Sequence, residues 1–198
     1  MIRLPKLAVF AAVLGVATAA AAASDPAAVV GDFNAALVAT MKDGKALGLQ
    51  GRAAKLLPLV RATHDMNGMT RLVAGPVWTA TSPPERTALT DAFTRHSVLA
   101  YAANFASFDG QRFTVAPKVD MRGADALVHG AIVAKDGTTV LNYRLHQTES
   151  GWRIVDVYAD GISQIAVQRA EFAATLKAGG AAALAAKLTA ADDAKVKR

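Results

Sequence analysis

The chain has 198 residues, of which 53% are hydrophobic, 19% charged and 6% aromatic, and its formal net charge is +6. It contains no cysteine, which excludes disulfides, thiolate metal sites and a cysteine nucleophile. The composition is too hydrophobic for a disordered chain, and the length suits a single domain.

Residues 1–23 have the pattern of an export signal. Arg3 and Lys6 give a positive start, Leu7 to Val16 form a short apolar stretch, and small residues follow as far as Ala23. The apolar stretch is shorter than the roughly 20 residues that span a bilayer. We expect cleavage after Ala23, with Ala21 as the other candidate, and export of a soluble protein to the periplasm.

Residues 24–190 are predicted to form one domain, and its first half carries helical signals. Asp25 followed by Pro26 is typical of a helix start. The predicted helix carries an apolar residue at every fourth position, namely Val29, Phe33, Leu37 and Met41. This spacing indicates an amphipathic helix with one buried face.

Two shorter helices and one long helix are predicted next. The shorter ones cover about residues 52–63, with Pro58 kinking or restarting the helix, and about residues 66–77. Ser82 and Glu85 have the spacing of a capping box. A long amphipathic helix is therefore predicted to follow Ser82.

After residue 110 the apolar spacing changes from helical to strand-like. The predicted strands are Phe113 to Val119 with a break at Pro117, Ala126 to Ala134, Thr138 to Gln147, and Trp152 to Tyr158. Asp136-Gly137 and Ser150-Gly151 separate consecutive strands as hairpin turns do. Helices followed by an antiparallel meander of about four strands predict the α+β class.

A last helical region is expected after Asp160-Gly161, and Gly179-Gly180 divides it into two helices. Residues 191–198 are predicted to form a flexible basic tail that includes Lys195, Lys197 and Arg198. The sequence shows no internal repeat and no interdomain linker, so we predict a single domain.

The sequence contains no motif of a known catalytic or cofactor site. It has no nucleophile elbow, no His-Glu-x-x-His pair, no phosphate-binding glycine loop and no dinucleotide fingerprint. None of the histidines, His64, His96, His129 and His146, lies at helical ligand spacing from another. We therefore predict no metal and no cofactor. An acid–base pair of His129 with Asp156 on adjacent strands is the alternative.

The basic net charge has several interpretations. The lysines and arginines are dispersed and no aromatic residues are interleaved with them, so nucleic-acid binding is not expected. Weak attraction to anionic lipid headgroups or to an acidic partner stays open, beside a basic surface that serves solubility.

Several motifs occur in a recognisable order. Met69 to Trp78, Thr79 to Arg86 and Phe93 are followed by Asn142 to Leu145, Gly151 to Val157, Asp160 to Ser163 and Arg169 to Phe172. In this order and spacing they resemble the MlaC family of periplasmic phospholipid-binding proteins, also described as toluene-tolerance auxiliary components. The resemblance covers about residues 25–188.

The resemblance implies an α+β cone like that of nuclear transport factor 2, with N-terminal helices, a curved antiparallel sheet and an apolar cavity. It implies a lipid carrier that moves between an outer-membrane lipoprotein complex and an inner-membrane ABC-type transporter, with transient membrane contact and no catalysis. The cargo is phospholipid, or a hopanoid-type lipid as in a hopanoid-associated branch of the family. Two positions depart from the family pattern: His64 replaces a usual phenylalanine, and Gly75-Pro76-Val77-Trp78 replaces Gly-Arg-Tyr-Trp.

Apolar residues of the predicted strands are the candidate lipid contacts, because alternate side chains of a strand share a face. The candidates are Leu141, Tyr143 and Leu145 on one strand, Val155 and Val157 on the next, Val128 and Ile132 on the one before, and Phe93 and Trp78 from the helical half. From spacing alone a packed core is the better interpretation of these stripes. The resemblance favours a lipid cavity.

Two other classes of function stay open. One is an isomerase or hydratase of the same cone-shaped fold that uses Asp156 or His129 beside Tyr143. The other is a periplasmic assembly factor that binds protein in its groove. The arginines of the family motifs are expected to form ion pairs or helix caps rather than headgroup contacts; they are Arg71, Arg144 and Arg169.

Overall fold

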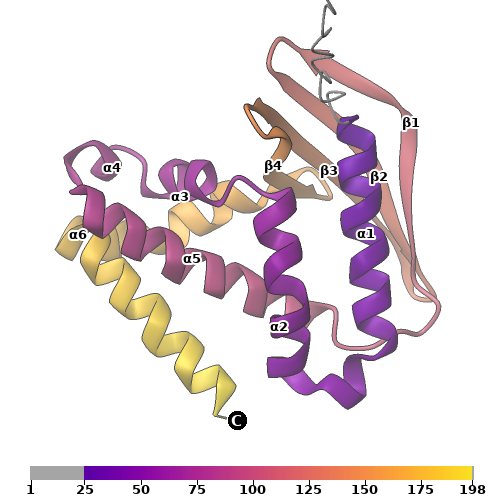
Figure 1. Ribbon diagram of the computed structural model, residues 1–198, viewed down its shortest axis with the longest axis horizontal. Coiled ribbons are helices and arrows are strands. Elements are labelled where there is room, and N and C mark those ends of the chain that lie inside the picture. The colour runs from indigo at the N-terminus through magenta and orange to yellow at the C-terminus, as the bar shows by residue number, and fades with distance from the viewer. Residues whose placement is uncertain (1–24, 198) are drawn as a thin grey trace, which may run out of the picture.

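The computed structural model describes residues 25–197. The predicted export signal, residues 1–23, lies outside the described residues. Within the described part of the chain, no helix combines the length and the apolar character needed to cross a membrane. The fold consists of a helical layer packed on one face of a curved antiparallel sheet (Figure 1).

Helix α1 (Pro26–Lys42) begins where the sequence predicts. The Asp25 side chain accepts a hydrogen bond from the Ala27 amide at 3.1 Å, and proline follows at the first helical position, where its missing N–H has no cost. Its buried apolar face consists of Val30, Phe33, Leu37 and Met41. Val29, predicted for this face, is only partly buried.

Helix α2 (Gly44–Thr63) is longer than predicted and bends at a different place. The non-helical residue is Gly48, with φ 61°, a conformation that costs glycine little because it has no Cβ atom. Pro58 lies within the helix and does not end it. The predicted helix over 66–77 is divided at Gly75-Pro76 into α3 (Met66–Ala74) and α4 (Val77–Ala80).

Helix α5 (Pro83–Asn104) starts with the predicted capping box. The Glu85 carboxylate accepts hydrogen bonds from the Ser82 amide at 3.0 Å and from the Ser82 hydroxyl at 2.6 Å. These two bonds hold the pKa of the Glu85 carboxyl below its usual value. Leu89 and Phe93 lie on the buried face of α5.

The sheet is a meander in the order β1-β2-β3-β4-β5, with every pair antiparallel. Its strands are β1 (Arg112–Arg122), β2 (Asp125–Ala134), β3 (Gly137–Thr148), β4 (Gly151–Ala159) and β5 (Ile162–Ser163). Four of them match the predicted strands. The fifth has two residues, too few for an alternating pattern to appear in the sequence.

Two irregularities interrupt the alternation of side chains. In β1 the register shifts between Val115 and Val119, around the predicted break at Pro117. In β4 the partners of Arg144 and Leu145 are Asp156 and Ile154, so one extra residue lies between them. This bulge was not predicted, and it changes which side chains of β4 face the helices.

Helix α6 (Gln164–Val196) starts at Ser163, whose hydroxyl accepts a hydrogen bond from the Ala166 amide at 3.0 Å. Gly179 and Gly180 are non-helical, which confirms the predicted division into two segments. The predicted flexible tail from residue 191 is instead helical as far as Val196. Its order has a physical cause, because Asp192 is buried and lies 2.9 Å from the His96 ring.

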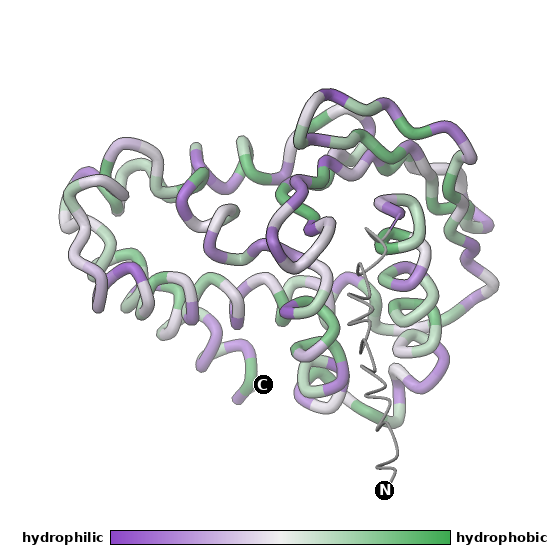
Figure 2. Tube along the Cα trace, turned by 45° about the horizontal axis from the view of Figure 1, so that its top comes forward, coloured by the Kyte–Doolittle hydropathy of each residue, from purple (hydrophilic) through white to green (hydrophobic). Residues whose placement is uncertain are grey.

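The helices cover one face of the sheet and leave the other face open. Helices α1 and α2 lie against the strands, and α5 and the second half of α6 pack together away from them (Figures 1 and 2). Apolar residues concentrate between the two layers. We call the sheet face toward the helices the inner face and the opposite one the outer face.

Candidate functional site

Residue pairing defines the inner face of the sheet. Tyr143 of β3 pairs with Val128 of β2 and with Val157 of β4, and directly paired residues of antiparallel strands share a face. Tyr143 and Val128 are buried. The inner face therefore carries the predicted apolar stripe, and the sheet turns this stripe toward the helices.

A cavity of about 230 Å³ lies between the inner face and helices α3, α5 and α6. Its apolar wall includes Met66, Met69, Tyr101, Phe105, Leu141 and Val157. We call it the inner cavity. Methionine and aromatic side chains suit a cavity for a flexible apolar ligand, because thioethers and rings adapt to chains of variable shape.

A row of rings runs along the helical wall. The Tyr101 ring centre lies 5.8 Å from that of His64 and 6.2 Å from that of Phe105. Phe105 in turn lies 5.8 Å from Phe113 of β1, and Phe33 closes the other end at 4.8 Å from His64. The row joins three helices to the first strand and gives the cavity a stiff wall.

His64 is the imidazole of this row, and its ring is neutral. Burial lowers the pKa of His64 to about 3. The Thr63 hydroxyl donates to the Leu59 carbonyl at 2.8 Å, so it accepts from His64 Nδ1 at 2.9 Å. His64 Nε2 is therefore an acceptor for the Tyr101 hydroxyl at 3.2 Å. Both polar groups are satisfied without a charge.

Three amide side chains and one carboxylate add polar groups to the lining of the inner cavity. Asn104, Gln164 and Gln168 contribute amide side chains, and no lysine or arginine is among the residues that line the cavity. Asp156 also reaches the wall, where its carboxylate accepts from the Ser163 hydroxyl at 2.5 Å and from the Ile165 amide at 3.2 Å. These bonds tie Asp156 to the start of α6, so it serves as a helix cap.

The predicted lipid-contacting residues occupy three kinds of position. Leu141 and Val157 line the inner cavity. Val128, Tyr143, Leu145, Phe93 and Trp78 are buried in the core that surrounds it. Ile132 lies on the inner face opposite Phe113, toward the end of β2. The structure thus brings most of the set to one side of the sheet and two members to the cavity itself.

Val155 has no partner in the pairing of β4 with β3. Ile154 pairs with Leu145 and Val157 pairs with Tyr143, so the inner positions of β4 are three residues apart. The bulge between them leaves Val155 buried but outside the continuous core cluster. Strict alternation along the sequence could not reveal this extra residue.

Sequence reasoning missed the helical half of the cavity wall. Tyr101 and Phe105 are four residues apart at the end of α5, and Met66 and Met69 are three apart in α3. Such spacings place side chains on one helix face. The sequence offered one signal that could have found this wall. Tyr101 and Phe105 are large apolar residues that continue beyond the buried stripe of α5, next to an exposed segment.

Trp78 has a structural role in this fold. The Arg86 guanidinium lies 5.3 Å from the centre of the Trp78 ring, and Arg86 Nε donates to the Trp78 carbonyl at 3.1 Å. Trp78 is not among the residues that line the inner cavity. The tryptophan therefore anchors α4 to α5.

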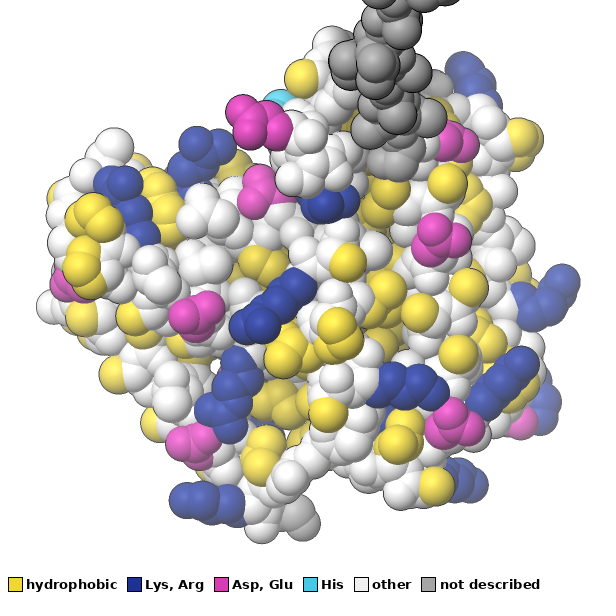
Figure 3. All heavy atoms as spheres, in the orientation of Figure 1, with side chains coloured by type: hydrophobic (Ala, Val, Ile, Leu, Met, Phe, Trp, Pro, Cys, Tyr) yellow, Lys and Arg dark blue, Asp and Glu magenta, His cyan; other side chains and the backbone are white. Residues whose placement is uncertain are grey.

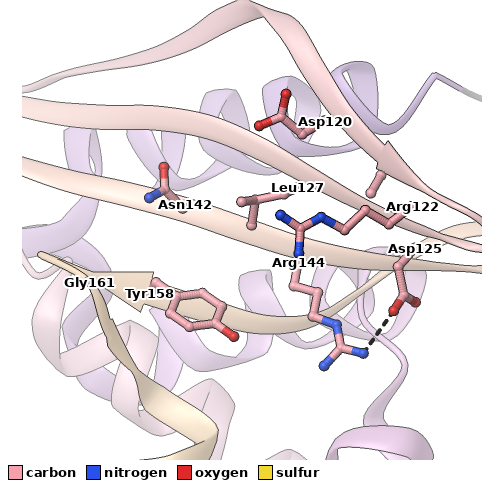
Figure 4. A pocket seen from close by; sticks show the side chains of 9 residues that line it. Asp120, Arg122, Asp125, Leu127, Asn142, Arg144, Tyr158 and Gly161 are labelled. Atoms are coloured by element: carbon pink, nitrogen blue, oxygen red, sulfur yellow. Dashed lines mark hydrogen bonds and ion pairs between the residues drawn. The ribbon is translucent and has the colours of Figure 1, made fainter.

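The outer face carries a shallow hollow of about 450 Å³ with mixed charge (Figure 4). Arg144 donates to Asp125 at 2.8 Å, and His146 lies 2.7 Å from the same carboxylate, so the pKa of Asp125 is held below its usual value. His129 lies between Asp120 at 2.9 Å and the Asn142 amide oxygen at 3.0 Å, and these bonds raise its pKa. Charges of the outer face largely neutralise one another.

The alternative catalytic groups do not come together. His129 belongs to β2 and Asp156 to β4, and β3 lies between these strands, so the predicted adjacent pair is wrong. His129 is on the outer face, whereas the Tyr143 hydroxyl donates to Asn34 on the inner side at 2.9 Å. Within residues 25–197, no three acidic or histidine side chains are grouped as ligands for a metal ion.

The curved sheet, the helices that cover its inner face and the apolar cavity between them define an α+β domain. The MlaC protein family matches residues 32–190, which is most of the chain. The chain belongs to the MlaC family. Both the predicted family and the predicted fold class are thus confirmed.

A solved structure supports the same fold. The phospholipid-binding protein from Ralstonia solanacearum, in complex with a phospholipid, is similar with a TM-score of 0.77 and 21% sequence identity. The alignment covers 88% of this chain and 100% of that chain. None of the curated proteins matches this chain in sequence.

Proposed function

We propose that this protein binds a phospholipid in the inner cavity and carries it across the periplasm. The observation that carries the proposal is the apolar cavity between the inner face and α5, with Leu141 and Val157 opposite Tyr101 and Phe105. Membership in the MlaC family and the phospholipid complex of the similar Ralstonia solanacearum protein support the choice of ligand.

The physical need for such a cavity follows from the cargo. A lipid with two acyl chains exposes roughly thirty methylenes, and each gains about 0.8 kcal/mol on leaving water. A carrier must therefore offer an apolar surface of comparable extent. The neutral state of His64 and the hydrogen-bonded state of the Asp156 carboxylate suit this task, because a buried unpaired charge beside acyl chains would be costly.

The partners follow from the same proposal. A shuttle docks at an outer-membrane lipoprotein complex and at an inner-membrane ABC-type transporter, and its export signal over residues 1–23 delivers it to the space between them. The net charge of +6 includes two basic residues of that signal and still leaves the remainder positive. Positive charge raises the rate of encounter with acidic surfaces, and this effect weakens as the salt concentration rises.

The test is to recover the exported protein and identify its ligand. Native mass spectrometry should show a retained mass, and solvent extraction followed by lipid analysis should identify a phospholipid. A hopanoid in the extract would change the cargo but keep the carrier. Empty protein that also takes up no lipid from phospholipid vesicles would refute the proposal.

A further inference from the structure

The hollow on the outer face, which we call the outer hollow, has no part in the proposed lipid binding. It shares no lining residue with the inner cavity. Leu127 of β2 pairs with Asp120 of β1 and with Arg144 of β3. Asn142 of β3 pairs with Tyr158 of β4. Directly paired residues share a face, so four strands contribute side chains to this one surface.

Both carboxylates of the outer hollow already have partners. Asp125 accepts from Arg144 at 2.8 Å through one oxygen, and His146 lies 2.7 Å from the other. Asp120 lies 2.9 Å from His129 with one oxygen and 3.4 Å from a lysine ammonium with the other. Neither carboxylate has an oxygen left to neutralise a further cation.

Arg122 is the cation left over. It pairs with Asp125 in the register of β1 and β2, but it forms no ion pair within the described chain. In Figure 4 its guanidinium reaches across the sheet toward Leu127 and Arg144. Arg144 uses only Nη2 for its bond to Asp125, although a guanidinium has five N–H donors. The two guanidinium groups thus converge on one hollow, whereas lysine and arginine side chains are spread over the side of the molecule shown in Figure 3.

Neutral groups complete the lining of the outer hollow. The Asn142 amide oxygen accepts from His129 at 3.0 Å, and the amide NH₂ group has no acceptor within residues 25–197. The Tyr158 hydroxyl points toward Arg144 (Figure 4). Leu127 and the Tyr158 ring supply apolar surface beside these polar groups. Free donors next to an apolar floor suit a carboxylate on a short hydrocarbon stem.

The open shape of the outer hollow indicates a side chain of a larger partner rather than a free small molecule. The hollow measures about 450 Å³, and every residue that lines it comes from β1 to β4 or from the turn after β4. Small-molecule sites bury roughly 70–90% of the ligand surface. A ligand that lies on one face of a sheet is not enclosed to that extent. A side chain held by a folded partner needs no such enclosure.

The mixed charge of the outer hollow favours a protein partner over an anionic membrane. Asp120 and Asp125 lie in the same lining as the two arginines. A continuous layer of lipid phosphates would meet these two carboxylates, and like charges at close range disfavour such a contact. A single carboxylate can lie between Arg122 and Arg144 without this repulsion.

We propose that the outer hollow binds an acidic side chain of a partner protein. The aspartate or glutamate carboxylate lies between Arg122 and Arg144, where charge-assisted hydrogen bonds fix its orientation. Its stem lies against Leu127 and the Tyr158 ring, and the Asn142 amide donates to a backbone carbonyl of the partner. The site is on the side of the sheet opposite the inner cavity. The inference therefore goes beyond the carrier function and does not depend on it.

The first experiment maps a defined acidic probe onto the sheet by NMR. Isotope-labelled protein is titrated with the blocked peptide Ac-Gly-Glu-Gly-Leu-Gly-NH₂ and with the same peptide carrying glutamine in place of glutamate. The glutamate peptide should bind with a Kd on the order of 1 mM, shift the backbone amide signals around Arg122, Leu127 and Arg144, and bind more weakly as salt rises. The glutamine peptide should bind about fivefold more weakly. Absent binding, equal binding of the two peptides, or shifts confined to another surface would overturn the proposal.

Two arginines near opposite ends of β1 give a matched pair of variants. Arg112 and Arg122 are both exposed, and only Arg122 lines the outer hollow. Arg122→Gln should weaken binding of the glutamate peptide about fivefold. Arg112→Gln removes the same charge from the same strand and should bind like the wild type. An equal loss in both variants would reduce the effect to net charge and overturn the site, and circular dichroism checks that both are folded.

The outcomes separate this inference from the carrier function and from membrane contact. A wild type that binds the glutamate peptide but takes up no lipid would refute the carrier and leave the outer hollow assigned. A wild type that loads lipid but does not bind the peptide would overturn the outer hollow and leave the carrier intact. Binding to phosphatidylglycerol vesicles that is tighter than peptide binding and is lost in Arg122→Gln would assign the hollow to a membrane and overturn the protein partner.

Discussion

Successive side chains of a strand point to opposite faces of the sheet, and the two sides of the sheet shift the pKa of histidine in opposite directions. On the inner side, burial lowers the pKa of His64 to about 3 and keeps its ring neutral. On the outer side, the hydrogen bond that His129 donates to the Asp120 carboxylate raises the pKa of His129. The comparison teaches that position relative to the sheet, rather than residue type, decides where this protein keeps charge.

The sharpest test of the comparison uses two neighbouring residues of β2. Val128 is fully buried on the inner face, whereas Leu127 lines the outer hollow. Val128→Asp should destabilise the fold by about 4 kcal/mol or more, because it buries an unpaired carboxylate. Leu127→Asp should cost no more than about 1 kcal/mol. Urea unfolding followed by circular dichroism measures both, and similar losses would contradict the assignment of faces.

The next largest effect concerns acid stability. His64 has a folded-state pKa of about 3 against 6.5 unfolded, so the unfolded chain binds a proton that the folded chain excludes. Its contribution to stability is therefore present above pH 6.5 and is lost as the pH falls toward 3. From pH 7 to pH 5 this amounts to about 2 kcal/mol.

His64→Phe should flatten this pH dependence, and denaturant melts at several pH values measure it. His129→Gln is the matched control. Its raised pKa has the opposite sign, with stability lost as the pH rises, and its exposure makes the effect small. A slope below pH 6.5 that is the same in His64→Phe and in the wild type would show that another group causes the acid sensitivity.

A third test compares lipid retention for neighbouring residues of β3. Leu141 lines the inner cavity, whereas Asn142 lines the outer hollow. Leu141→Asp should reduce the retained phospholipid by about tenfold, since a charge would face the acyl chains. Asn142→Asp should retain the wild-type load. Lipid extraction from folded protein measures both, and a full load in Leu141→Asp would place the ligand elsewhere.

The smallest effect is expected for the ion pairs of the outer face. Arg144 and Asp125 are both partly exposed, at 45% and 32% of their side chains. Arg144→Gln should lower stability by about 0.5 kcal/mol at low salt, and the difference should shrink near 1 M salt because the charges are screened. A loss above about 2 kcal/mol would mean that the outer face holds the fold together more than its exposure suggests.

Local chemistry made much of the fold predictable. Helix caps and glycine breaks depend on a few neighbouring residues, so their sequence signals translate directly into structure. Examples are the caps at Asp25 and Ser82 and the division at Gly179-Gly180. The kink at Gly48 was missed because glycine within a helix is also tolerated in the helical conformation. Pro58 was the stronger sequence signal for a break, yet the helix continues through it.

The candidate site was predictable only in part, because a cavity depends on distant segments. The inner-face stripe of β3 follows from alternation, but which face it belongs to depends on helices packed against it. The bulge at Val155 arises from pairing with β3 and leaves no mark in the sequence of β4. Tyr101 and Phe105 were assigned to no site because their neighbours come from β1, β3 and β4.

The strand order of the sheet has a consequence for how the protein folds. Each strand pairs with the next one along the chain, so every hairpin closes a short loop. The bond from Tyr143 to Asn34, by contrast, joins residues 109 positions apart. Closing long loops costs more entropy and slows folding. We expect the hairpins to be formed in the folding transition state while α1 is still undocked, which exposes the apolar inner face to other chains and makes that interval the one most prone to aggregation.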